Sequence, residues 1–309
     1  MKKNNHIIIA ASCLLFSFLF AKELPSNLNN NRNTSRVAVA NGPNTSVLNI
    51  NQIAYWISAD AAYTTGGSPN GVSADYPIFT GGFIYADGML WGAKVTDHLG
   101  EAEVRVGGST YYHGLKAGRV IYKDGAVVGS DDPINNHVWR VRRDWASGDL
   151  TTDAANYYGY TSAGDVTAEQ IATVKGQYEY DWMNWPAAWG APYEDVDGDG
   201  SYNPSTDIPG YPGADQTLWT IANDVPTIVD ANGDSVGYQS TAPNLYGADP
   251  IGIELQITMW GYAFGAGDPL GNMIFKKATM KYTGLPDSPA NSKMEDLYFT
   301  QWSDPDLGT

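Results

Sequence analysis

Cysteine is almost absent from this 309-residue chain, and basic residues are scarce. The single cysteine, Cys13, lies inside an apolar run, so the rest of the chain offers no thiol for a disulfide or for nucleophilic catalysis. Lys and Arg number 18 against 34 Asp and Glu, which gives a net charge of −16. Such a field repels nucleic acid and anionic membrane surfaces and is compatible with cation binding. We therefore expect no nucleic-acid partner.

Motifs of catalysis are missing as well. The chain has no His-Glu-x-x-His helix and no phosphate-binding Walker pattern, and the segment 107–111 lacks the last glycine of a Gly-x-Ser-x-Gly elbow. His98, His113 and His137 are too far apart for a recognised zinc spacing, so we assign each a structural or surface role. With 34 acids, pairs of carboxylates suited to glycoside hydrolysis are expected by chance. The sequence therefore indicates no specific enzymatic activity.

A short basic start and an apolar run occupy the N-terminus. Lys2 and Lys3 precede about 15 apolar residues that end at Ala21. This is the pattern of a secretory signal peptide over 1–21, and it is short for a spanning helix of about 20 residues. A retained anchor is the alternative. Removal of the signal leaves 16 basic and 34 acidic residues, with no membrane span expected in the remainder.

The rest of the chain divides into two parts. Residues 22–46 are rich in Asn, Ser and Thr, which predicts a disordered leader, and residues 47–309 predict a β-rich globular region. About 290 exported residues can bury a core without disulfides. The chain stops at Thr309 without a terminal element, so we expect the globular region to be truncated there.

The spacing of turn residues in the globular region is typical of β structure. With 34 Gly and 17 Pro, long helices have little room. Two Asp-Gly pairs, at 87–88 and 124–125, predict hairpin turns between flanking strands. Apolar residues at every second position from Ile251 to Ile257 predict one buried face. The predicted strands cover 83–85, 89–91, 104–106, 119–122, 126–128, 218–222, 251–262, 273–282 and 297–302.

One helical insertion is predicted near 166–182. Thr167 followed by Gln170 fits a capping box, with Asp165 as an alternative cap. Apolar residues then recur at helical spacing up to Trp182, before Pro186 ends the pattern. We therefore predict an all-β fold, an antiparallel β-sandwich-like region with this short helix inserted.

The sharpest motif is an acidic loop at 195–207. Carboxylates on alternate residues, followed by a glycine that lets the chain turn, can surround a hard cation such as Ca²⁺, which takes six to eight oxygen ligands. The closing acid falls at position 13 instead of 12, and Pro204 interrupts any exiting helix, so this is no standard helix–loop–helix site. The alternative is a solvated acidic turn without an ion. The predicted Ca²⁺ ligands are Asp195, Asp197, Asp199, Ser201, Asn203 and Asp207.

A second acidic segment, 230–235, carries oxygen-bearing side chains at positions 1, 3 and 5 but Ser235 where glycine belongs. A hairpin turn is its favoured interpretation.

Aromatic residues crowd together just before the acidic loop. Exposed Trp and Tyr rings bind ligands and partners, so Trp182, Trp185 and Trp189 are candidate glycan-binding residues. The favoured alternative is that these rings pack the helix onto the sheet.

Several segments resemble the N-terminal region of large, mostly uncharacterised proteins secreted by Bacteroidota, which commonly end in a type IX secretion sorting domain. The matching segments lie at 84–95, 185–192, 195–200, 218–224, 251–256, 273–277 and 302–308. The resemblance implies a secreted or cell-surface protein and brings no catalytic residues. It also implies that the chain runs on past the Asp-Pro-Asp-Leu-Gly segment.

Together these features predict a non-enzymatic, calcium-stabilised extracellular β domain of a large surface protein, serving adhesion, scaffolding or glycan contact, with glycans or other surface proteins as partners. A secreted polysaccharide-acting hydrolase or a carbohydrate-binding module is the alternative.

Overall fold

The computed structural model describes residues 44–63, 67–123, 126–129, 136–225, 227–229, 235–238, 245, 248–286 and 288–306. The expected signal peptide and nearly all of the expected leader lie outside these residues. The first strand, β1 (Thr45–Leu48), begins two residues before the expected start of the globular region. Within the described part of the chain, no helix is long and apolar enough to cross a membrane.

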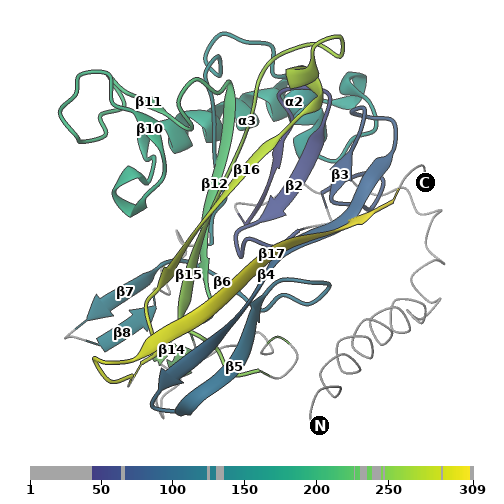
Figure 1. Ribbon diagram of the computed structural model, residues 1–309. Coiled ribbons are helices and arrows are strands. Elements are labelled where there is room, and N and C mark those ends of the chain that lie inside the picture. The colour runs from purple at the N-terminus through teal and green to yellow at the C-terminus, as the bar shows by residue number, and fades with distance from the viewer. Residues whose placement is uncertain are drawn as a thin grey trace. The chain divides into compact units, whose positions relative to one another are not determined.

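Antiparallel sheets make up most of the regular secondary structure of the described chain, which confirms the all-β class (Figure 1). The larger sheet has the order β1-β2-β3-β4-β17, and β5 also pairs with β4. Its other strands are β2 (Ala54–Ser58), β3 (Ala74–Asp75), β4 (Gly82–Asp97), β5 (Gly100–Gly108) and β17 (Lys293–Pro305). Figure 1 shows β17 running beside β4 for most of its length.

The second sheet has the order β16-β15-β12-β6, with β9 also paired to β12. Its strands are β6 (Lys116–Ala117), β9 (Trp139–Arg142), β12 (Gln216–Asn223), β15 (Ile253–Gly261) and β16 (Phe275–Tyr282). Three two-stranded sheets complete the described set. They pair β7 (Val120–Lys123) with β8 (Ala126–Gly129), β10 (Tyr193–Glu194) with β11 (Ile208–Pro209), and β13 (Thr227–Val229) with β14 (Ser235–Tyr238).

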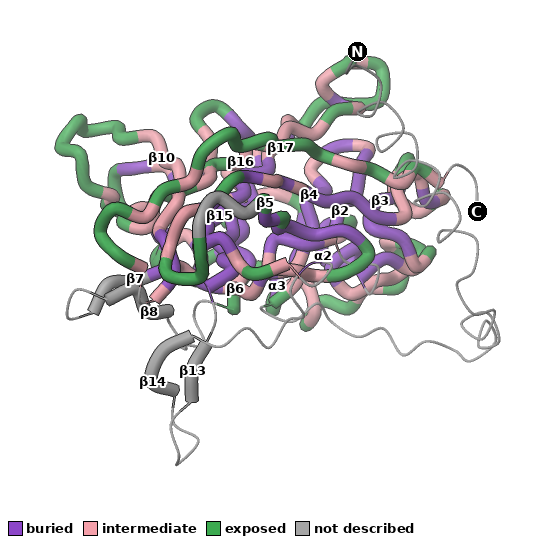
Figure 2. The backbone as a smooth tube through the Cα atoms, turned by 60° about the horizontal axis from the view of Figure 1, so that its bottom comes forward, coloured by how far each residue is buried: buried purple, intermediate pink, exposed green. Residues whose placement is uncertain are grey.

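One hydrophobic core joins the two larger sheets. Tyr55 and Trp91 of the first sheet lie in the same buried cluster as Leu218, Leu255 and Ile257 of the second. The alternation predicted for 251–257 is confirmed on this face of β15, because its apolar residues are fully buried. Figure 2 shows that much of β17, by contrast, is exposed.

The predicted helical insertion is confirmed as α3 (Ala168–Met183). Thr167 is its N-cap, and its side chain and that of Gln170 form the reciprocal capping box. Val174 and Tyr178 face a second buried cluster that includes Trp56. A second helix, α2 (Thr151–Tyr157), was not predicted, because seven residues are too few for a helical period to be recognised. The described residues also form three short 3₁₀ helices, η3 (Ala163–Asp165), η4 (Ala187–Trp189) and η6 (Pro269–Asn272).

The hairpin predicted at Asp87-Gly88 is wrong, because β4 continues through both residues. Asp87 is buried and accepts hydrogen bonds from the Tyr55 hydroxyl and from Gln301 Nε2. Gly88 is required by crowding instead of by a turn, since a Cβ there would lie 2.3 Å from the Ser109 carbonyl oxygen. The β4–β5 hairpin instead turns between Asp97 and Gly100.

The other predicted strands exist with shifted ends. β7 pairs with β8 as predicted, and the Asp124-Gly125 turn between them lies outside the described residues. The strand predicted from position 273 begins at Phe275, after η6.

Candidate functional site

The acidic loop is closed at its base by two short paired strands. β10 pairs with β11 through Tyr193 opposite Pro209 and Glu194 opposite Ile208. Because these pairs stand directly before Asp195 and directly after Asp207, the two ends of the motif are held side by side. The loop itself turns through Gly198 and Gly200, whose φ angles of +75° and +79° suit glycine.

Three carboxylates of the loop converge. One oxygen each from Asp195, Asp197 and Asp207 lies within 4.8 Å of the others. Two oxygens that bind one Ca²⁺ at about 2.3–2.6 Å lie at most about 5 Å apart, so this spacing fits a shared ion. The three side chains therefore form the candidate metal site, which we call the Asp195 site.

Backbone N–H groups fix two of these carboxylates. Asp195 Oδ1 accepts from Gly198 at 2.8 Å, and its Oδ2 accepts from Gly200 at 2.9 Å. Asp207, which is 2 % exposed, accepts from Val196 at 2.9 Å and from Asn203 at 2.7 Å. The carboxylates are thus oriented by the loop backbone.

The acid at position 13 therefore belongs to the cluster although its spacing departs from the standard motif. Asp199 lies outside the group of converging carboxylates, and its Oδ1 accepts a hydrogen bond from the Ser201 N–H at 2.7 Å. The Asn203 side chain accepts from the Ser205 N–H at 3.0 Å. Of the four predicted carboxylate ligands, the structure brings together Asp195, Asp197 and Asp207.

The local electrostatic effect of the loop is visible at two tyrosines. The pKa of Tyr193 is raised by desolvation and then by the surrounding carboxylates, Asp195 first among them. The pKa of Tyr202 is raised by burial and by the charge of Asp207. In both shifts desolvation is the larger cause, and the charges of the loop carboxylates add to it.

The tryptophans before the loop pack into the fold. Trp185 is 4 % exposed and lies in a buried cluster with Trp139 and Trp219, with Trp182 and Trp189 partly buried against it. The Trp185 indole N–H donates to the Pro192 carbonyl oxygen at 2.8 Å, and that of Trp182 donates to Pro204 at 3.2 Å. These contacts support the packing interpretation and tie the Asp195 site to α3.

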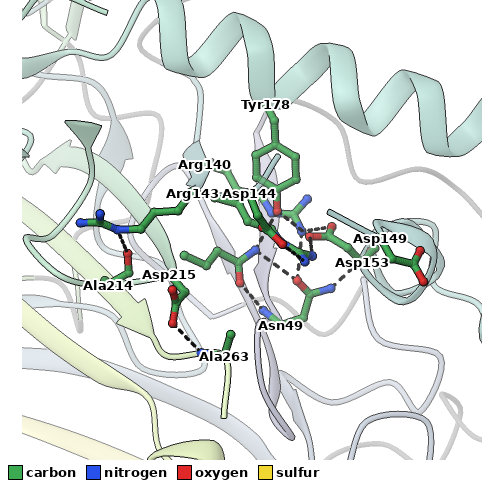
Figure 3. Close-up of polar contacts among 12 residues, drawn as sticks. Asn49, Arg140, Arg143, Asp144, Asp149, Asp153, Tyr178, Ala214, Asp215 and Ala263 are labelled. Atoms are coloured by element: carbon green, nitrogen blue, oxygen red, sulfur yellow. Dashed lines mark hydrogen bonds and ion pairs between the residues drawn. The ribbon is translucent and has the colours of Figure 1, made fainter. Parts of the chain in front are cut away.

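A buried polar network lies beneath the two helices (Figure 3). Arg140 on β9 forms an ion pair with Asp153 on α2, and Tyr178 on α3 donates to Asp153 at 2.6 Å. Asn49 and Gln216 join the network, as the Asn49 N–H donates to Gln216 Oε1 at 2.7 Å. All five residues are buried, so the network fastens α2 and α3 to the second sheet and to the segment that follows β1.

Two histidines contact carboxylates within the described part of the chain. His113 Nδ1 contacts Asp60 Oδ2 at 2.8 Å. The backbones of Ser109 and His113 form an isolated antiparallel β-bridge. The Ser109 hydroxyl is buried and has no hydrogen-bond partner among the described residues, so it makes no hydrogen bond to the His113 ring. His137 contacts the buried Asp181 at 2.7 Å and packs against Trp139, which fits the predicted structural role.

Two outcomes remain for the sequence-based sites. The acidic segment 230–235 lies outside the described residues except for Ser235, where β14 begins.

Sequence reasoning missed a group of partly exposed rings around Tyr111, because its members come from four distant segments.

Comparison with known proteins adds no relative. No protein-family model, curated protein or solved structure matches this chain.

Proposed function

We propose that this chain is a non-enzymatic, calcium-stabilised β domain of a larger surface or secreted protein, with a contact role in adhesion, scaffolding or glycan binding. One observation carries the calcium part. The oxygens of Asp195, Asp197 and Asp207 lie within 4.8 Å of one another, a spacing that one Ca²⁺ can span. Without a cation, these three carboxylates repel one another.

The rest of the proposal is supported by composition. A chain without cysteine beyond position 13 has no disulfide to stabilise it outside the cytoplasm, and a bound ion provides such a constraint. The N-terminal apolar run and the resemblance to secreted Bacteroidota proteins support export to the cell surface or the medium.

Calorimetric titration of chelator-treated protein with CaCl₂ tests the metal site. Asp197→Ala is the informative variant, because Asp197 accepts only long hydrogen bonds, from the Asp199 N–H at 3.2 Å and the Thr206 hydroxyl at 3.3 Å. Asp165→Ala removes an exposed acid outside the loop and is the matched control. We expect one Ca²⁺ site in the wild type and the control, and at least tenfold weaker binding in Asp197→Ala.

Thermal unfolding supplies the second readout. Ca²⁺ at about 100 times its dissociation constant stabilises the native state by about 2.7 kcal/mol, so EDTA should lower the Tm of the wild type and not that of Asp197→Ala. An unchanged wild-type Tm in EDTA, together with no heat of Ca²⁺ binding, would show that the loop is a solvated acidic turn.

A further inference from the structure

A continuous row of rings lies where four distant segments meet. Tyr63 contacts His113 at 5.6 Å and Trp302 at 6.5 Å between ring centroids. Tyr111 lies 5.2 Å from Trp302 and 6.5 Å from Tyr85. These five residues, which we call the Tyr111 ring cluster, come from the segment after β2, from β4, from the turn after β5 and from β17.

Exposure distinguishes this cluster from the packed tryptophans near the acidic loop. None of its five members is buried, and Tyr111 is 44 % exposed. In the packed cluster, by contrast, Trp139, Trp185 and Trp219 are at most 4 % exposed. Rings that gather without a buried member do not form a core, and exposed groups of aromatic residues mark binding surfaces.

Polar contacts hold the rings in place. The Trp302 indole N–H donates to the Ser109 carbonyl oxygen at 2.6 Å. The indole lies against Gly88, because a Cβ at that position would be only 2.6 Å from the indole nitrogen. The Tyr111 hydroxyl donates to Asp304 Oδ2 at 2.7 Å. Because these rings are fixed before any ligand arrives, binding would require little further loss of side-chain freedom.

The chemistry of the cluster selects a ligand class. Ring faces carry negative partial charge and attract the C–H groups of a pyranose, and carboxylates accept hydrogen bonds from its hydroxyls. Asp304 adjoins Tyr111, and Asp60 adjoins His113. Among the described residues, no Lys or Arg lies over these rings or pairs with these two acids, and the one cationic group at the cluster, His113, is already paired with Asp60.

We propose that the Tyr111 ring cluster binds a neutral glycan. The inference deepens the contact role proposed above and rests on it, but it is independent of the Asp195 site. It also differs from the sequence-based expectation, which placed glycan contact at Trp182, Trp185 and Trp189.

Affinity electrophoresis in gels that contain a soluble polysaccharide tests the proposal. The probes are hydroxyethyl cellulose, xylan, galactomannan and amylopectin as neutral glycans, with alginate as the uronate comparison, all run with CaCl₂ present. The variants Tyr111→Ala and Tyr85→Ala remove rings at two points of the cluster, so the test survives if one of them fails to fold. Tyr298→Ala is the matched control, because Tyr298 is 79 % exposed on β17 and is not a member of the cluster.

At least one neutral probe should retard the wild type and Tyr298→Ala, and each folded cluster variant should bind that probe at least tenfold more weakly. Tyr111→Phe should retain most of the binding, since it keeps the ring. Retardation by alginate alone, no retardation by any neutral probe, or equal retardation of the wild type and the cluster variants would overturn the proposal. Calcium titration of the same samples separates this failure from failure of the Asp195 site.

Discussion

The hydroxyl group of Tyr178 on α3 donates a 2.6 Å hydrogen bond to the buried carboxylate of Asp153 on α2. The same hydroxyl accepts a 2.8 Å hydrogen bond from Gln216 Nε2 on β12. Arg140 lies over the Tyr178 ring, 4.6 Å from its centroid, and forms an ion pair with Asp153. One phenol thus joins two helices to the second sheet.

We expect Tyr178→Phe to lower the free energy of unfolding by about 1–3 kcal/mol, because it leaves the buried Gln216 and Asp153 each without one partner. Urea denaturation measures the change. Tyr180→Phe is the control, since Tyr180 is 49 % exposed on the same helix, and we expect its effect to stay within about 0.5 kcal/mol. Similar losses in both variants would contradict the role of the network.

Gly88→Ala tests the crowding that replaces the predicted turn. An added Cβ would lie 2.3 Å from the Ser109 carbonyl oxygen, so either the backbone or Trp302 must shift, and we expect destabilisation by about 1–3 kcal/mol. The matched control should change the free energy of unfolding in the opposite direction. Gly176 lies inside α3 with nothing near its missing Cβ, so Gly176→Ala should stabilise by about 0.5–1 kcal/mol. Equal effects of the two substitutions in urea denaturation would refute the crowding argument.

The ion pair between His113 and Asp60 should make stability depend on pH. The hydrogen bond between His113 and Asp60 raises the pKa of His113, although burial opposes the shift. Burial acts to raise the pKa of Asp60, but the hydrogen bond and the charge of His113 prevail and lower it. The stabilisation from His113 is therefore complete below about pH 6.5 and is lost as pH rises through its raised pKa. The stabilisation from Asp60 is lost only as pH falls through its lowered pKa.

Accordingly, His113→Gln should destabilise the protein by about 1 kcal/mol at pH 5.5 and by less at pH 9. The expected value is small because the His113 side chain is 41 % exposed and solvent screens the pair. Urea denaturation at the two pH values measures the difference. His98→Gln serves as the control, since the His98 ring contacts only the Ser288 hydroxyl among its described hydrogen-bond partners. A pH-independent effect of His113→Gln would rule out the ion pair as its cause.

The capping box at the start of α3 predicts a defined loss of stability when its side-chain oxygen is removed. Thr167→Ala removes the side-chain oxygen that accepts from the Gln170 N–H, and we expect destabilisation by about 1 kcal/mol. Thr167→Ser keeps that oxygen and should restore most of the stability. If both variants behave alike, the hydroxyl is not the stabilising group.

Local patterns predicted the elements whose cause is local. Thr167 and Gln170 stand three residues apart and determine where α3 begins, so the sequence alone located the helix. The pair Asp87-Gly88 carries an equally strong local turn signal, yet its conformation follows from Tyr55 and Gln301, which are remote in the chain. Such contacts leave no periodic trace that a single sequence can show.

In the acidic loop, too, a local pattern was predictable and a contact between remote residues was not. Alternating acids identified the region, but the spacing placed equal weight on Asp199 and less on Asp207. Pairing of β10 with β11 brings Asp207 back beside Asp195 and Asp197, and that pairing could not be predicted from two-residue strands. The buried network around Arg140 was equally invisible, because its members come from five separate elements and loops.

The pairing of β4 with β17 has a consequence for the order of folding. Asp87 and Gln301, which contact each other across this pair, are separated by 214 positions. During synthesis from the N-terminus, β4 can pair early with β3 and β5, but its pairing with β17 must wait until nearly all the described chain has followed it. Sheets with such high contact order fold slowly and leave strand edges unpaired meanwhile. We expect this domain to complete its fold after the chain has emerged, not segment by segment.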